Sequence, residues 1–177
     1  MTKARVATLW LDGCSGCHMS FLDLDERLLE IAGMIELVYS PVMDAKEFPE
    51  GVDLTLVEGA IASDEDVEKI KMVRGRTKLL VALGDCAVTG NVPAMRNSFP
   101  LADVLRRGYV DNATANSGAP DREVPKLEKK VIPLHELVPV DLFVPGCPPS
   151  ADLIYFVLSE VLAGRVPDLA SKSHFGN

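Results

Sequence analysis

Four cysteines are the residues of this 177-residue sequence whose type and spacing favour metal or redox chemistry. Cys14 and Cys17 form a C-x-x-C, whereas Cys86 and Cys147 stand alone far along the chain. A C-x-x-C is typical of zinc sites, redox disulfides, c-type haem attachment and iron–sulfur ligation. A single free cysteine is also often a small buried hydrophobic residue. The positions of all four therefore have to distinguish these alternatives.

Each cysteine follows a short apolar run of the kind that forms a buried parallel strand. Cys14 and Cys17 come after "VATLWL", Cys86 after "KLLVALG" and Cys147 after "VDLFVPG". Glu58 stands at the end of a further such run, "VDLTLVEG". Because the carboxyl ends of parallel strands meet at one edge of a sheet, these five side chains are expected at the same rim, where open α/β sheets bind ligands.

The elements that position them alternate between strand and helix patterns, which predicts a flavodoxin-like α/β fold: a doubly wound parallel sheet of order 2-1-3-4-5 in three layers. The predicted strands are 6–11, 35–40, 52–59, 78–84 and 140–146. The predicted helices are one from about Ser15 or Met19 to Ala32, one after Ser63, one over 101–107 and one after Ser150. We expect a single domain over 1–177, interrupted by an irregular, polar insertion at about 109–130.

Composition narrows the function classes. The formal net charge is −8, which disfavours nucleic-acid binding, since that depends on neutralising phosphates. The apolar run near the N-terminus is too short for a signal peptide, and no stretch reaches the length of a membrane span. We therefore expect a cytoplasmic chain with no membrane span, whose cysteines stay reduced and serve metal or redox chemistry.

Among metals, an iron–sulfur cluster suits the cysteines better than zinc. Four-cysteine zinc sites usually combine two local C-x-x-C pairs, whereas here two ligands arrive singly from distant strands. A [4Fe-4S] cluster takes one thiolate per iron and is wider. Gly13, Gly16, Gly84 and Gly146 flank the cysteines and would allow close approach of the backbone to such a group. A zinc-stabilised, non-catalytic interaction module remains the alternative, while a redox disulfide leaves two cysteines unexplained and haem attachment requires export.

Four segments, "GCSGCHMSFLD", "VEGAI", "LGDCAVTGNVPAMRN" and "PGCPPS", resemble the small subunits of [NiFe] hydrogenases, relatives of the cluster-bearing subunit of respiratory complex I. The resemblance covers about residues 5–163 and is strongest to the small subunits of cytoplasmic, bidirectional, NAD-reducing hydrogenases. It implies an electron-transferring chain with one [4Fe-4S] cluster held by Cys14, Cys17, Cys86 and Cys147.

The resemblance also implies partners. These are a large subunit with the Ni–Fe centre that cleaves H2, a ferredoxin-like iron–sulfur subunit and a flavin-containing diaphorase that reduces NAD+. FMN is expected on the diaphorase rather than in this chain, because the cysteines take up the crevice at the rim. A twin-arginine signal and a C-terminal domain with further clusters, found in respiratory uptake hydrogenases, are not expected. A complex I-like, quinone-linked subunit is the alternative. In the complex I relatives, however, the first two cysteines are adjacent, whereas here two residues separate Cys14 from Cys17.

Glu58 is the remaining candidate site residue. A carboxylate at the rim could relay protons between the large subunit and solvent, or approach the cluster as an oxygen ligand. The competing interpretation is an exposed acid at a strand end. Nearby, His18 could donate to a sulfide, relay protons or be an ordinary first-turn residue. Asp85 could tune the cluster or bind backbone amides and is expected to shape a loop, and Thr89 and Asn91 are expected to hydrogen-bond near the cluster.

Overall fold

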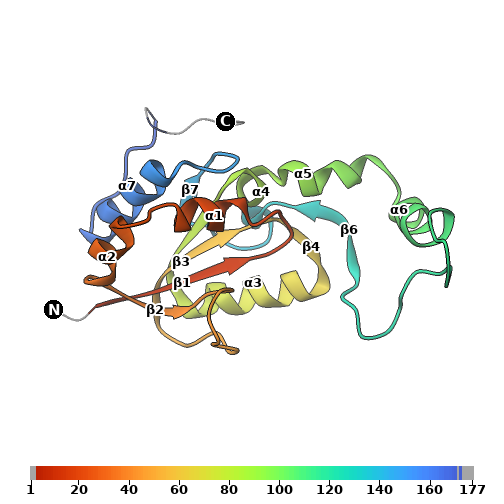
Figure 1. The fold of residues 1–177 in the computed structure, drawn as a ribbon, viewed down its shortest axis with the longest axis horizontal. Coiled ribbons are helices and arrows are strands. Elements are labelled where there is room, and N and C mark those ends of the chain that lie inside the picture. The colour runs from red at the N-terminus through yellow and green to blue at the C-terminus, as the bar shows by residue number, and fades with distance from the viewer. Residues whose placement is uncertain (1–2, 171, 173–177) are drawn as a thin grey trace.

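In the computed structural model, which describes residues 3–170 and 172, five parallel strands form one sheet of order β2-β1-β3-β5-β7 (Figure 1). The strands are β1 (Ala4–Trp10), β2 (Ile35–Tyr39), β3 (Val52–Glu58), β5 (Thr77–Leu83) and β7 (Leu142–Val144). Counted within this sheet alone, the order is 2-1-3-4-5, so the predicted flavodoxin-like topology is confirmed.

Helices cover both faces of the sheet, giving three layers (Figure 1). The helices are α1 (Gly16–Leu22), α2 (Arg27–Ala32), α3 (Asp64–Arg76), α4 (Asp85–Thr89), α5 (Asn91–Ala94), α6 (Leu101–Arg106) and α7 (Ala151–Leu162). Successive strand residues point to opposite faces, so Val81 joins the core under α1, α2 and α7, and Ala82 joins the core under α3 and α4. Both cores are fully buried, which explains the continuous apolar character of the strands.

The helix predicted from about Ser15 or Met19 to Ala32 is wrong as a single element. The structure contains two helices, α1 and α2, with a turn between them. Asp25 in that turn has φ 50°, a left-handed conformation that no α-helix contains. Leu24 and Ile31 nevertheless reach the same core, so the apolar spacing correctly identified the buried positions.

The start of α3 confirms the expected N-cap. Ser63 Oγ accepts a hydrogen bond from the Asp66 backbone, and the Asp66 carboxylate accepts one from the Ser63 backbone, which completes a capping box. Ser150 likewise caps α7 by accepting a hydrogen bond from the Leu153 backbone. Both caps fix where a helix begins relative to the strand that precedes it.

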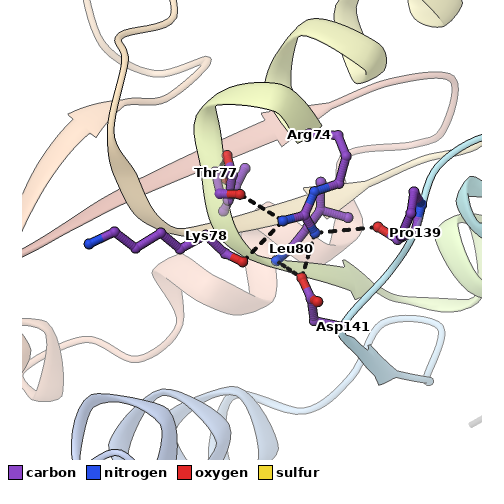
Figure 2. A network of polar contacts seen from close by, with 7 residues as sticks. Arg74, Thr77, Lys78, Leu80, Pro139 and Asp141 are labelled. Carbon is purple, nitrogen blue, oxygen red and sulfur yellow. Dashed lines mark hydrogen bonds and ion pairs between the residues drawn. The ribbon is translucent and has the colours of Figure 1, made fainter.

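Arg74, in the last turn of α3, ties the amino ends of two strands together (Figure 2). One guanidinium nitrogen donates to the carbonyls of Thr77 (2.7 Å) and Lys78 (3.0 Å), and the other contacts the Asp141 carboxylate at 2.5 Å. The same carboxylate accepts a hydrogen bond from the Leu80 backbone at 2.7 Å. Burial would raise the pKa of Asp141, but the Leu80 amide and Arg74 outweigh it and lower that pKa. This cluster holds the chain that enters β7 against β5.

A second, antiparallel sheet of two strands lies within the described residues and was not predicted. It pairs β4 (Ile61–Ser63) with β6 (Leu127–Ile132). Within the expected irregular segment 109–130, residues 109–111 complete a helical turn that begins at Arg107, and residues 127–130 belong to β6. Residues 112–126 contain neither helix nor strand. Helices α5 and α6 and strand β6 extend away from the main sheet (Figure 1). Within the described ranges, every helix is too short or too polar to cross a membrane.

Candidate functional site

The carboxyl edge of the main sheet carries a small cavity into which all four cysteines converge. It has a volume of about 60 Å³. Its lining residues are Gly13, Cys14, Gly16, Cys17, Glu58, Gly59, Asp85, Cys86, Gly146, Cys147 and Pro148. The structure thus brings together every candidate site residue of the sequence: the four thiols and Glu58.

The cysteines reach this cavity from three strands. Cys14 lies in the loop after β1, Cys17 in the first turn of α1, Cys86 in the first turn of α4 and Cys147 in the loop after β7. All four, which lie within the described residues, are free thiols. Cys14 and Cys147 are exposed, whereas Cys17 and Cys86 are partly buried. The cavity therefore has a buried floor and a mouth at the surface.

Asp85 joins the loop that carries Cys86 to the loop that carries Cys147. Its carboxylate accepts a hydrogen bond from the Gly146 backbone at 2.7 Å, and its own backbone N–H donates to the Gly146 carbonyl at 2.9 Å. Asp85 is only 6% exposed, so this contact is sheltered from water. Asp85 therefore shapes its loop, as expected, by binding Gly146, the residue that precedes Cys147 in the loop after β7.

Ser20 makes the corresponding connection from α1. Its hydroxyl donates to the Pro149 carbonyl at 2.5 Å, in the turn that follows Cys147. Ser20 is buried, and sequence reasoning did not single it out. Its signal was its place one turn after Cys17, on the face of α1 that meets the last loop.

Gly84 leaves room for the thiol of Cys17. Its φ of 82° lies in the region that favours glycine, and a Cβ at this position would overlap Cys17 Sγ. The close approach that the sequence predicted for the flanking glycines is present here. The backbone that follows β5 therefore lies against the thiol of Cys17.

The surroundings of Cys17 and Cys86 raise the pKa of both thiols. Burial raises the pKa of Cys17, and nearby Glu58 and the other three thiols raise it further. Burial, with Cys14 and Cys147 beside it, raises the pKa of Cys86 to about 11. Four thiols in one small cavity are a donor set suited to a cationic metal group, whose binding displaces their protons.

Glu58 is buried, not exposed, so the interpretation as a solvent-exposed acid at a strand end is wrong. The side chain is 2% exposed because Glu58 ends a central strand and α1 covers it. Its Oε2 accepts a hydrogen bond from the His18 backbone at 2.6 Å and lies 2.7 Å from His18 Nδ1. The pairing of Glu58 with His18 was not predicted, although both residues were placed at the rim.

His18 leaves one ring nitrogen without a partner. Nε2 is buried and has no hydrogen-bond partner in the part of the chain that the structure describes. The ring packs edge-on against Trp10, with centroids 5.3 Å apart. Since Nδ1 faces a carboxylate oxygen, it carries the proton in the neutral ring, and Nε2 is then an acceptor.

Asn91 lies beside Cys147, as expected of a residue that bonds near the site. Its side-chain nitrogen donates to Cys147 Sγ at 3.4 Å. Thr89, in contrast, donates to the Asp85 carbonyl within its own helix.

The chain is similar to proteins of one family. The family model for the 20 kDa subunit of NADH ubiquinone oxidoreductase matches residues 14–161. The delta subunit of the NAD-reducing hydrogenase HoxS of Cupriavidus necator is 45% identical over 176 residues, which cover 96% of this chain and 83% of that subunit.

The match to a second relative covers a smaller part of that relative's length. A subunit of the F420-non-reducing hydrogenase of Methanocaldococcus jannaschii is 39% identical over 170 residues, covering 95% of this chain but 59% of that relative. Among solved structures, one chain of a NAD+-reducing [NiFe]-hydrogenase in the H2-reduced state superposes with a TM-score of 0.94 at 38% identity. That match covers 99% of this chain and 100% of the other.

Proposed function

The chain belongs to the family of the 20 kDa subunit of NADH ubiquinone oxidoreductase, and we propose that it is the electron-transfer small subunit of a NAD-reducing [NiFe] hydrogenase. The observation that carries this proposal is the convergence of four thiols on one cavity at the carboxyl edge of the sheet. The relatives with hydrogenase names, at 45% and 39% identity, support it.

Cys14, Cys17, Cys86 and Cys147 would hold one [4Fe-4S] cluster. When bound, such a cluster supplies one-electron transfer at a potential set by its protein surroundings. The thiols suit a group wider than a single ion. In the described residues, no three His, Cys, Asp or Glu side chains are arranged to hold one metal ion, yet the four thiols share a cavity. The zinc-stabilised module is disfavoured by that arrangement.

The remaining residues of the cavity prepare it for the thiolates. Gly84 lacks a side chain, so Cys17 can pack against the backbone. Asp85 fixes the distance between the loops of Cys86 and Cys147 through its two hydrogen bonds to Gly146. These contacts hold the loops that carry the ligands in place, as hydrogen bonds behind the ligands commonly do in metal sites.

We place a large subunit with the Ni–Fe centre over the mouth of the cavity. Cys14 and Cys147 are exposed there, and exposed apolar side chains lie close by in the sequence: Met19 (61% exposed) on α1 and Val92 (61%) on α5. Exposed apolar residues around a site are typical of a surface that a partner covers. Iron–sulfur and flavin-containing diaphorase subunits would complete the path to NAD+, a path that belongs in the cytoplasm because NAD+ is found there.

Glu58 and His18 provide a proton-holding pair beside the thiols. The carboxylate is buried, accepts from His18 and lines the cavity. We propose that Glu58 relays protons close to the large-subunit site, with His18 holding the carboxylate in place.

Anaerobic purification of the chain with its native partners tests the function. We expect iron and acid-labile sulfide in about a four-to-four ratio per chain, a brown visible spectrum and H2-dependent reduction of NAD+. Cys86→Ser should retain partner binding while losing iron and the spectrum. A colourless, zinc-containing chain, or a complex that reduces quinone but does not consume H2, would contradict the proposal.

A further inference from the structure

The turn between α4 and α5 returns the chain to the rim of the cysteine cavity. Gly90 and Asn91 both have positive φ, 86° and 33°. The Gly90 N–H closes α4 by donating to the Cys86 carbonyl at 3.0 Å. Two successive residues in this conformation reverse the chain sharply. As a result, residue 91 lies next to a cysteine that is 56 positions away in the sequence.

This turn donates hydrogen bonds to two thiols that come from different strands. The Asn91 side-chain nitrogen donates to Cys147 Sγ at 3.4 Å. The backbone N–H of Val92 donates to the Cys86 thiol and lowers its pKa against the larger, opposite effect of burial. The side of the cavity formed by β5 and β7 is therefore the side with N–H donors facing sulfur.

A donor that faces a thiolate stabilises negative charge on the sulfur. One-electron reduction adds one negative charge to an iron–sulfur cluster and its thiolates, while no bond in the chain forms or breaks. The hydrogen bond is therefore stronger in the reduced state, and hydrogen bonds to sulfur are among the factors that set cluster potentials.

We propose that Asn91 is a positioning residue that raises the reduction potential of the cluster through its hydrogen bond to Cys147, an inference that rests on the proposed function. Asn91 also supplies the positive φ of the turn, so its two roles have to be separated. Glycine keeps the backbone conformation and removes the amide donor. Aspartate has nearly the same shape and also tolerates positive φ, but it replaces the amide donor with a negative charge.

The experiment is anaerobic potentiometry of the complete complex, followed by electron paramagnetic resonance of the reduced cluster, for Asn91→Gly and Asn91→Asp. At a fixed potential, the ratio of reduced to oxidised cluster should fall roughly threefold to tenfold in Asn91→Gly, and further in Asn91→Asp because the carboxylate repels the reduced state. A tenfold change corresponds to 59 mV for one electron. Iron content should stay at the level of the unmodified complex.

Asn116→Gly is the matched control. Asn116 also has positive φ, 51°, and is exposed in the segment 112–126, away from the cysteines in the sequence. The same substitution there should leave the ratio unchanged. An equal shift in this control would overturn the proposal, since the effect would not depend on Cys147.

Two further results would overturn it. One is an unchanged ratio in fully loaded Asn91→Gly and Asn91→Asp complexes, which would leave the proposed function intact. The other is loss of iron in both variants, which would make Asn91 necessary for assembling the ligands. An unmodified complex without any iron–sulfur signal would instead contradict the proposed function, and this inference with it.

Discussion

The carboxylate of Glu58 is the most deeply buried charged group beside the cysteine cavity, at 2% exposure. A buried carboxylate is costly unless it is hydrogen-bonded. The backbone and ring nitrogens of His18 provide that compensation on one oxygen, at 2.6 and 2.7 Å. Burying a polar pair at this position costs more free energy than burying an apolar side chain would. Its presence there indicates a functional role for the pair.

We expect Glu58→Gln to keep the cluster spectrum and to slow H2 turnover and H/D exchange by roughly tenfold to hundredfold, because the amide cannot carry a proton to and from its oxygens. Turnover assays and mass spectrometry of the exchanged gas measure this. Glu47→Gln, at an exposed position far from the rim in sequence, is the control and should match the unmodified complex. Unchanged rates in Glu58→Gln would remove Glu58 from the mechanism.

Gly84 and Gly164 form a matched pair for testing the fit of the cavity. Both have positive φ, 82° and 73°, so alanine at either costs on the order of 1–3 kcal/mol in backbone strain. The cost is larger at Gly84, whose ψ of 161° places it in a region that is essentially restricted to glycine. Only at Gly84 would the new Cβ overlap a cysteine sulfur, whereas nothing lies within 4 Å of it at Gly164. Gly84→Ala should therefore lose iron as well as stability, and Gly164→Ala stability alone. Iron analysis and thermal unfolding separate the two, and full iron in Gly84→Ala would contradict the assigned fit.

At the scale of the elements, the two edges of the main sheet have different roles: one carries the candidate site and the other carries stabilising contacts. The carboxyl edge presents the thiols, and the amino edge carries the contacts of Arg74 with Thr77, Lys78 and Asp141 (Figure 2). Strand β7 spans only Leu142–Val144, so it has few ladder hydrogen bonds of its own. Its position next to β5, and with it the position of Cys147, depends on contacts at both of its ends.

We expect Arg74→Met to lower the free energy of unfolding by about 2–3 kcal/mol. The substitution leaves the Asp141 carboxylate with the Leu80 amide as its remaining donor. It also removes the guanidinium from three carbonyls, those of Thr77, Lys78 and Pro139. Denaturant titration of the complex's isolated small subunit, prepared with its cluster, measures this. Arg27→Met removes an ion pair to Asp152, whose carboxylate is 86% exposed, and should cost at most about 1 kcal/mol. Equal losses in both variants would show that Arg74 contributes no more than a surface pair.

The sheet and the convergence of the cysteines were predictable because both follow from the apolar runs of the sequence and from the residues that come directly after them. Buried parallel strands such as 52–58 are nearly continuous in hydrophobicity. Right-handed crossovers restrict the possible strand orders, and the order 2-1-3-4-5 is that of flavodoxin-like folds. The pairing of β4 with β6 was not predictable, because "LEKKVI" buries only Val131 and is polar in pattern. The break at Asp25 escaped prediction because it contains neither glycine nor proline. The contact between Glu58 and His18 joins positions 40 apart, which local patterns do not encode.

At the scale of the whole molecule, the cavity lies at the carboxyl edge of the sheet and reaches the surface at the exposed Cys14 and Cys147. Met95 and Phe99, 68% and 65% exposed, extend the apolar surface along the chain that follows α5. Exposed apolar side chains beside a site are typical of a surface that a partner covers, so a partner is the expected cover.

The proposed cluster should therefore lose iron to a ferrous-iron chelator several-fold faster in the chain alone than in the complete complex. The fading of visible absorbance under anaerobic conditions measures this rate. The same samples without chelator provide the control for spontaneous decay. Equal rates in chain and complex would show that the mouth of the cavity is not where the large subunit sits.

The last loop of the site has a consequence for how the protein is made. Cys147 follows β7, and its loop is fixed by Asp85 and by Ser20. Chains emerge from the ribosome with the amino end first. Cys14, Cys17 and Cys86 are therefore synthesised well before Cys147. A complete ligand set exists only once β7 has joined the sheet. Iron and sulfide for the proposed cluster would then be delivered to a folded, finished chain, through the mouth that we propose the large subunit covers.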